Sequence, residues 1–175
     1  MSLMSPAKPK RSETDEVRRA VAAFVAAGAD ESVQRVITTV HRVSRRLDQW
    51  YDRQLADLGV TAGEWAVLGE LARSEAGTAC TPTQLALAAN VAPSSMTHRL
   101  DRMVERNLIS READPNNRTR VLVRLSDAGW KLYAHAIQDA NLVESDVMAG
   151  LSGQQVDELA SLLERVLAGL DQAVI

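Results

Sequence analysis

Residues 93–129 read PSSMTHRLDRMVERNLISREADPNNRTRVLVRLSDAG. The first part of this stretch has the spacing of a helix with one buried face, because its apolar residues fall at Met96, Leu100, Met103 and Val104. The opposite face of that helix is polar and consists of Ser94, Ser95, Thr97, His98, Asp101 and Arg102. The stretch therefore begins with a helix that presents a polar surface to solvent.

The helical period is lost after Asn107, and two short β-strands are expected to follow. Leu108 and Ile109 lead into the first strand, and Asp114–Asn117 has the composition of a turn. In the second strand apolar residues alternate with arginines, as Val121, Val123 and Leu125 do with Arg120 and Arg124. A polar-faced helix followed by an arginine-bearing hairpin can place one element in a DNA major groove and another beside it.

Charge is unevenly distributed along the chain. The whole sequence has a formal net charge of -3, whereas residues 93–124 contain more arginines than carboxylates. The arginines are Arg99, Arg102, Arg106, Arg111, Arg118, Arg120 and Arg124, and the acids are Asp101, Glu105, Glu112 and Asp114. Because phosphate contact is local, an acidic protein with a basic reading surface can bind DNA. The alternative is a solvated face with helix ion pairs, such as Arg102 with Glu105.

Length and composition indicate a self-sufficient soluble chain. Its 175 residues, 46% of them hydrophobic, are enough for a core. The single cysteine, Cys80, excludes an internal disulfide and is interpreted as an inert thiol. No apolar run is long enough to span a bilayer and no signal-peptide pattern is present, so we expect a cytoplasmic location without a membrane partner. Residues 1–11 are interpreted as a disordered leader.

Two helices are expected before the central stretch. The first begins after Ser12 and ends at Gly28, and the second runs from about Glu31 to Leu58. The predicted buried side of the second is Val33, Val36, Ile37, Val40, Val43, Leu47, Trp50, Tyr51 and Leu55. A helix of this length has more apolar surface than one short neighbour covers, so an intermolecular contact and an ordinary core position both remain open.

Two capping boxes then mark a helix-turn-helix. Thr61 with Glu64 begins a helix that reaches about Arg73, and Thr81 with Gln84 begins a short helix. The inward residues of the short helix are expected to be Leu85, Ala88 and Ala89, and Asn90–Ala92 form the turn into Pro93. After the hairpin, two more helices are predicted, from Ser126 to about Ala149 and from Ser152 to about Ala173. We therefore expect three regions: the N-terminal helices over residues 12–60, the helix-turn-helix with its hairpin over residues 61–125, and the C-terminal helices over residues 126–175.

This order of elements resembles the MarR family of winged helix-turn-helix transcriptional regulators. The resemblance covers about Glu31–Leu170 and is strongest at ADPNNRTRVLVRLSDAG, residues 113–129, which is similar to the family's wing signature. It implies a mainly α fold with a small β-hairpin wing and N- and C-terminal dimerisation helices. It also implies a homodimer that acts as a ligand-responsive repressor on a pseudo-palindromic operator in double-stranded DNA, with half-sites about 34 Å apart.

The resemblance assigns DNA contacts to individual residues. Ser94, Ser95, Thr97, His98 and Arg102 would face the major groove, Arg118 would reach the minor groove as the wing arginine, and Arg120 would contact phosphate or pair with Asp114. Four positions depart from the family pattern. His98 stands where an arginine is common, Asn117 where an aspartate precedes the wing arginine, Asn107 where glycine is frequent, and Ala92 in place of a capping hydroxyl.

A small aromatic or phenolic effector is the second ligand that the resemblance implies. An aromatic wall with a cation suits an aromatic carboxylate, which makes His41, Arg45, Trp50 and Trp65 the candidates, although tryptophans are more often core residues. The urate-responsive branch is not supported, because Ala66 follows Trp65 where that branch has an acid.

No enzyme, cofactor or metal site is expected. The three histidines, His41, His98 and His135, lack metal-ligand spacing, and there is neither a glycine-rich phosphate loop nor a nucleophile elbow. A functional alternative of another class is a winged-helix protein-interaction module, whose basic surface would dock an acidic partner instead of specific DNA.

Overall fold

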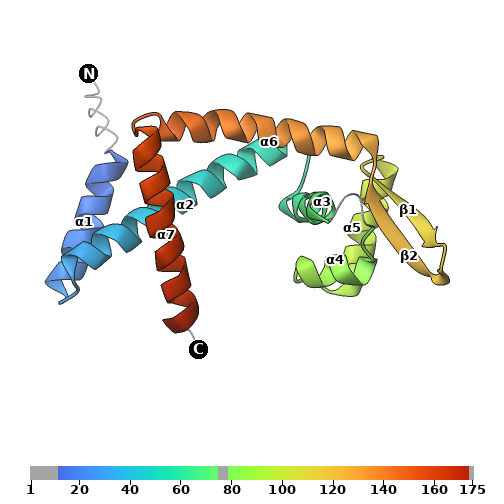
Figure 1. The fold of residues 1–175 in the computed structure, drawn as a ribbon, viewed down its shortest axis with the longest axis horizontal. Helices are drawn as coiled ribbons and strands as arrows, with labels where there is room; N and C mark the ends of the chain where they lie inside the picture. The colour runs from blue at the N-terminus through green and yellow to red at the C-terminus, as the bar shows by residue number, and fades with distance from the viewer. Residues whose placement is uncertain (1–11, 75–78, 174–175) are drawn as a thin grey trace, which may run out of the picture. The chain divides into compact units, whose positions relative to one another are not determined.

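The computed structural model describes residues 12–74 and 79–173, without the side chains of Arg118 and Ala173. The chain divides after Leu58 into two compact units. Its described elements are seven helices and one antiparallel hairpin, which confirms the expected fold class, mainly α with a small β-hairpin (Figure 1). The predicted leader over residues 1–11 lies outside the described residues. None of the described helices is long and apolar enough to cross a membrane.

The first unit is a pair of helices, α1 (Glu13–Ala26) and α2 (Glu31–Asp57), which pack against each other. Both helices begin where the sequence predicts, and the side chains of Ser12 and Asp30 cap them by accepting hydrogen bonds from the first turns. Arg42 on α2 binds two carboxylates of the first turns of α1, Glu13 and Glu16. This charged contact fastens the N-terminal end of α1 to the middle of α2.

The predicted buried side of α2 is largely exposed within one chain. Its N-terminal half presents Val33, Val36, Ile37, Val40 and Val43 to solvent, each at least 39% exposed. Leu55 is fully buried, whereas Leu47, Trp50 and Tyr51 are half-buried. Of the two alternatives left open for this face, an ordinary core position within one chain is therefore contradicted for the N-terminal half, and an intermolecular contact remains open. The physical reason is that α1 covers only one side of this part of α2.

The core of the second unit lies between α3 (Ala62–Arg73), α4 (Pro82–Ala88), α5 (Pro93–Glu105) and the hairpin. Its fully buried side chains are Leu68, Leu85, Met96, Leu100, Met103, Val67 and Val123. Both predicted capping boxes are present, at Thr61 with Glu64 and at Thr81 with Gln84. The helix-turn-helix therefore begins and turns where its sequence signals indicate.

Two predicted core positions in this unit were wrong. Ala88 on α4 is exposed and Ala86 is buried instead, and Val104 on α5 is 40% exposed. Each residue of an α-helix turns by about 100°, so a short helix contacts its neighbours over one narrow arc. The arc of α4 is centred on Leu85 and Ala86, and Val104 lies at the edge of the arc that Met96, Leu100 and Met103 occupy.

The hairpin consists of β1 (Ile109–Asp114) and β2 (Asn117–Leu125), with Ile109 opposite Leu125 and a register shift next to Asp114. Cys80 forms an isolated antiparallel bridge with Val123. The Cys80 N–H donates to the Val123 carbonyl at 3.1 Å, and the Val123 N–H donates back at 2.8 Å. These two backbone hydrogen bonds join the base of the hairpin to the segment before α4.

Two long helices complete the second unit, α6 (Asp127–Met148) and α7 (Gly153–Ala173). Ser126 caps α6, and Gly129 in its first turn lies against the backbone of Leu108, where a Cβ would come 1.9 Å from the carbonyl oxygen. Every described side chain of α7 is exposed except that of Val156, which is half-buried. The apolar side of α7 is Leu159, Leu162, Leu163, Val166, Leu167 and Leu170.

Candidate nucleic-acid interface

Helix α5 divides into a buried face and an exposed polar face, as its sequence predicts. Met96, Leu100 and Met103 have no exposed surface. All five of the residues predicted to face the major groove are exposed: Ser94, Ser95, Thr97, His98 and Arg102. The Thr97 hydroxyl donates its proton to the Pro93 carbonyl at 3.1 Å, so in this conformation its oxygen remains free to accept but not to donate.

The N-terminus of α5 carries unpaired backbone donors. Ala92, at the N-cap, makes no side-chain hydrogen bond, and Pro93 at the first helical position has no N–H. No described residue accepts a hydrogen bond from the N–H of Ser94 or Ser95. An uncapped helix end of this kind, with two adjacent hydroxyls, is suited to an anion such as a phosphate group. The missing cap hydroxyl that departs from the family pattern thus leaves donors available on the exposed side.

Asp114 organises the turn of the hairpin. Its carboxylate is buried, accepts the Asn116 N–H at 2.8 Å, and lies 3.8 Å from the guanidinium of Arg120. The expected Arg120–Asp114 pair is therefore formed. Arg120 also lines a groove of about 550 Å³ between β2 and the first turn of α4. A DNA strand in this groove would meet the Arg120 guanidinium already oriented by Asp114.

Asn117 and Arg118 follow the turn. The Asn117 side-chain oxygen accepts hydrogen bonds from the N–H and hydroxyl of Thr119, so it braces the start of β2 locally. Asn117 therefore fixes the backbone beside Arg118 without supplying the charged partner that an aspartate would offer. The position of the Arg118 side chain lies outside the described residues, and its predicted role remains a prediction.

Two arginines attach α5 to the elements on either side of it. Arg111 on β1 binds Asp101 of α5 at 2.6 Å, and Arg106 at the end of α5 binds Glu64 of α3 at 3.2 Å. Sequence reasoning assigned Glu64 to its capping box and counted both arginines only as basic surface. Their partners lie on other elements, so helical periodicity carried no signal for either contact.

Glu64 is a buried carboxylate with four favourable partners. Burial raises the pKa of its carboxyl, but hydrogen bonds from the Thr61 N–H and hydroxyl and the charges of Arg106 and Arg102 outweigh it, so the pKa lies below the ordinary value. Glu64 therefore stays ionised at neutral pH. One side chain caps α3 and holds the C-terminal end of α5.

Arg99 on α5 is a half-buried cation. Its guanidinium packs against the first turn of α3, where a Cβ on Gly63 would come within 2.5 Å of it. The Nη1 atom is buried without a hydrogen-bond partner among the described residues. Gly63 lies in the first turn of α3, and a glycine inside a helix can indicate that another group, here the Arg99 guanidinium, comes close to the backbone.

Ion pairs reduce the number of arginines available to DNA. Carboxylates neutralise Arg106, Arg111, Arg120 and Arg124 at distances of 2.6 to 3.9 Å. Arg102 makes no ion pair within the described residues, and in particular none with Glu105, although its charge acts on Glu64. Of the arginines on α5, Arg102 is therefore the exposed cation whose charge is available to a ligand.

Comparison with known proteins agrees with this geometry. The sequence pattern of the MarR family matches residues 58–118, from the end of α2 to the wing. The HTH-type transcriptional regulator PecS of Dickeya dadantii (strain 3937) is 30% identical over 131 residues, which cover 75% of this chain and 79% of PecS. The chain belongs to the MarR family. It is therefore a transcriptional regulator and not an enzyme.

Solved structures of MarR-family proteins share its fold. Wild-type MarR from E. coli in its apo form is 26% identical, with a TM-score of 0.62 over 74% of this chain and 93% of that protein. A mutant of S. aureus MepR bound to an oligodeoxyribonucleotide is 22% identical, with a TM-score of 0.60 over 75% of this chain and 95% of MepR. The arrangement of helices and wing is thus that of known MarR-family regulators.

The predicted effector residues of this MarR-family chain are divided between its two units. His41, Arg45 and Trp50 lie on α2 in the first unit, where Trp50 meets Tyr51 edge-on at 5.3 Å. Trp65 lies on α3 in the second unit and stacks on Tyr133 at 4.9 Å. Each tryptophan therefore already has an aromatic neighbour within its own unit, and the joint effector site remains a prediction.

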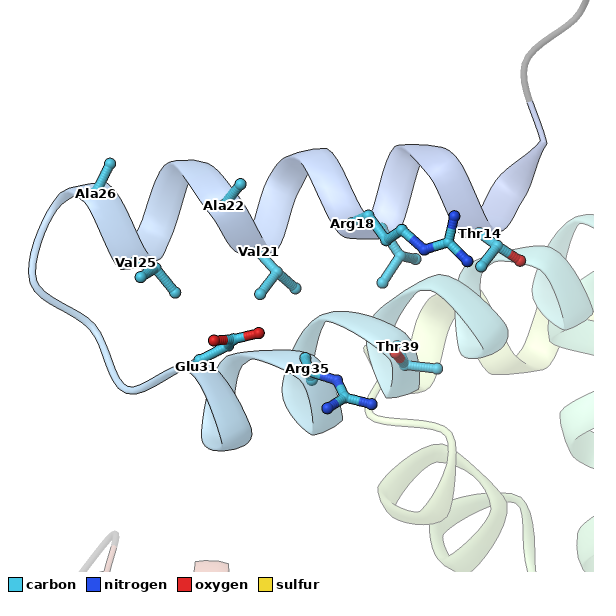
Figure 2. Close-up of a pocket in the computed structure, with 10 residues that line it drawn as sticks. Thr14, Arg18, Val21, Ala22, Val25, Ala26, Glu31, Arg35 and Thr39 are labelled. Carbon is cyan, nitrogen blue, oxygen red and sulfur yellow. The ribbon is translucent and has the colours of Figure 1, made fainter.

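The first unit contains a groove of about 800 Å³ between α1 and α2 (Figure 2). Val21 and Val25 of α1 point toward α2, and the charged side chains of Glu31 and Arg35 lie on α2 below them. His41, Arg45 and Trp50 do not line this groove. No group of histidine, cysteine or acidic side chains that could hold a metal ion occurs in the described parts of the chain.

Proposed function

We propose that this MarR-family regulator binds DNA sequence-specifically as a homodimer and represses transcription from a pseudo-palindromic operator. The observation that carries the proposal is the exposed polar face of α5, with unpaired N–H groups at Ser94 and Ser95 and an unpaired Arg102. A helix with these groups can contact phosphate through its N-terminus and base edges through its side chains. The adjacent hairpin would add contacts from Arg118 in the minor groove and Arg120 on the backbone.

The DNA-bound relative supports this assignment. MepR shares the fold and has been solved with an oligodeoxyribonucleotide. A basic patch that served only to dock an acidic protein would not need serines and a threonine on the same helix face. An interaction module and a repressor differ in one measurable respect, because only the repressor binds its own operator far more tightly than random DNA.

The proposed homodimer is supported by apolar surface that one chain leaves uncovered. The N-terminal half of α2 and the whole of α7 expose valine, isoleucine and leucine side chains. An apolar side along a helix normally packs against another element, so we expect a partner to cover the exposed leucines and valine of α7. A second copy related by a two-fold axis would cover these faces and place two α5 helices on successive major grooves about 34 Å apart.

The principal test uses duplexes that the protein selects from fragments of its own genome. We expect Arg118→Ala to weaken binding to the selected duplex about tenfold and to lower the salt slope by about one unit, because one charge contact is lost. Arg73→Ala removes an exposed arginine that pairs with Glu70 on α3 and should leave both quantities unchanged. Equal affinities of the wild type for selected and random DNA in anisotropy titrations would contradict the proposed function.

We propose in addition that a small aromatic or phenolic effector weakens DNA binding through His41, Arg45, Trp50 and Trp65. The supporting argument is chemical, since a cation beside aromatic rings suits an aromatic carboxylate. Benzoate and phenol, titrated into the protein–DNA complex, should release the duplex from the wild type. Arg45→Ala should abolish the response to benzoate, whereas Arg53→Ala, on the same helix, should retain it. Release that is identical in the two variants would count against this site.

A further inference from the structure

Arg111 makes a two-pronged contact between the hairpin and α5. Its Nη1 donates to the Asp101 carboxylate at 2.6 Å, and its Nη2 donates to the Thr97 carbonyl at 3.3 Å. Thr97 and Asp101 are one helical turn apart, so a single guanidinium grips two successive turns of α5. The side chain of Arg111 is 29% exposed, which shields the ion pair from part of the solvent.

The position of Arg111 in the sheet explains its reach. Arg111 is the cross-strand partner of Val123, and cross-strand partners lie on the same face of a sheet. Val123 is completely buried against the core, so Arg111 lies on the face of the hairpin that is turned toward the helices. Figure 1 shows β1 leaving the end of α5, and the two elements are in contact. The planar fork of arginine holds both direction and distance, which a lysine would not do.

A two-stranded hairpin needs such support. Isolated hairpins are only marginally stable in water, and bonds within the hairpin do not fix its angle to a helix. At the base, Ile109 and Val123 are buried and Cys80 bridges to β2. At the turn, Arg120 and Asp114 pair with each other inside the hairpin. Among the described residues, Arg111 provides the side-chain hydrogen bonds that join β1 to α5.

We propose that Arg111 is a positioning residue that fixes the wing at one angle to α5, so that the two elements engage DNA together. The inference rests on the proposed function and deepens it, because it concerns how one site delivers two sets of contacts. In this role Arg111 acts through Asp101 and the Thr97 carbonyl, which engage two of its five N–H donors, and it needs no DNA contact of its own. Loss of the contact would let the wing move independently and reduce the value of its own DNA contacts.

A double-mutant cycle with the wing residue tests the inference. Arg111→Gln should weaken binding to the selected duplex about tenfold, and Arg118→Ala should then cost about threefold instead of about tenfold, a coupling typical of linked sites. Arg73→Gln removes an arginine whose ion pair stays within one helix, so it should leave the cost of Arg118→Ala unchanged. An equal cost of Arg118→Ala in the Arg111→Gln and wild-type backgrounds would overturn the inference.

Salt dependence separates positioning from direct contact. In the Arg118→Ala background, Arg111→Gln should leave the slope of log K against log salt unchanged, whereas loss of a phosphate contact would lower it by about one unit. Asp101→Asn, which removes the same ion pair from the other side, should show the same loss of coupling to Arg118. Asp101→Asn carries the test if Arg111→Gln does not fold.

Failure of this inference differs from failure of the proposed function. A wild-type protein that selects no duplex would refute specific DNA binding as a whole. A wild-type protein that binds its selected duplex, while Arg111→Gln behaves like Arg73→Gln, would refute only the positioning role.

Discussion

The winged helix-turn-helix and the C-terminal helix α7 are both rich in apolar residues, but only the first buries them. Met96, Leu100 and Met103 on α5 have no exposed surface, whereas the leucines and valines along one side of α7 are 37% to 61% exposed. One chain therefore buries the apolar residues of its winged helix-turn-helix and leaves those of its C-terminal helix exposed. Sequences with the same helical period lead to different outcomes, because burial depends on which surfaces the rest of the chain supplies.

The largest expected effect tests how tightly the start of α6 packs against the winged helix-turn-helix. Gly129→Ala places a Cβ against the Leu108 carbonyl, which is backbone and cannot rotate away. We expect a loss of roughly 3 kcal/mol or more in the free energy of unfolding, measured by urea denaturation. Gly153→Ala is the matched control in the first turn of α7, where a Cβ meets no atom within 4 Å.

The Gly153→Ala control should be neutral or slightly stabilising, because alanine favours a helix over glycine by up to about 1 kcal/mol. Similar losses in the two variants would remove the contrast between a packed and an open region.

The second prediction concerns the exposed apolar side of α7. Leu163→Asp places a charge in the apolar side of α7, where Leu163 is 39% exposed in one chain. If a second copy covers this side, the substitution occurs twice by symmetry, and the dissociation constant of the dimer should rise at least about 100-fold. Sedimentation equilibrium measures the change.

Leu87→Asp on α4 provides the control for this prediction. Leu87 is 77% exposed and belongs to the winged helix-turn-helix, so its replacement should leave the oligomeric state unchanged. Retention of the wild-type oligomer by Leu163→Asp would mean that another surface joins the copies, and a wild-type monomer would contradict the homodimer itself.

The sequence predicted local structure well where one short motif suffices. The capping boxes at Thr61 and Thr81 begin α3 and α4, Asn107 ends α5 with a positive φ of 55°, and Asp114 forms the hairpin turn. Each of these features depends on residues within about four positions of one another. The polar face of α5 was predictable for the same reason, because helical periodicity is a local property.

Contacts between distant residues could not be predicted from one sequence. Glu64 and Arg106 are 42 positions apart in the sequence, and helices α4 and α5 both lie between Cys80 and its partner Val123. Periodicity identified an apolar side on α2, but it carries no information on whether that side faces the same chain or a second copy. The wing role of Arg118 and the effector residues came from the family resemblance and remain predictions.

A third prediction uses the buried carboxylate that links α3 to α5. Glu64→Gln keeps the capping hydrogen bonds but removes the charge that Arg106 meets, and we expect a cost of about 1 to 3 kcal/mol at pH 7. The folded pKa of Glu64 is lowered, so its contribution is present above the ordinary value of 4.5 and is lost as the pH falls through the folded value. The stability difference between wild type and variant should therefore shrink in acid.

Glu70 is a half-buried glutamate that pairs with the exposed Arg73 on the same helix, and Glu70→Gln should cost less than about 0.5 kcal/mol at either pH. Urea unfolding of both variants at pH 7 and at about pH 4 provides the measurement. A Glu64→Gln cost that does not change with pH would show that the charge is not what stabilises the contact.

The smallest expected effect concerns Cys80, at the bridge between the core and the wing. Burial raises the pKa of its thiol and the nearby Glu70 raises it further, while a hydrogen bond with Ser74 lowers it in part. Since the thiolate is the reactive form, Cys80 should react with a thiol reagent more slowly in the folded protein than in urea at neutral pH. Folding favours the protonated thiol. The contribution of Cys80 to the free energy of unfolding is therefore complete below the ordinary thiol pKa of 9.0, and it is lost as the pH rises through the pKa of the folded state. Cys80→Ala should change stability little at pH 7 and should make the stability of the protein less sensitive to alkaline pH. Labelling of Cys80 that is as fast in the folded protein as in urea would contradict the raised pKa of the thiol.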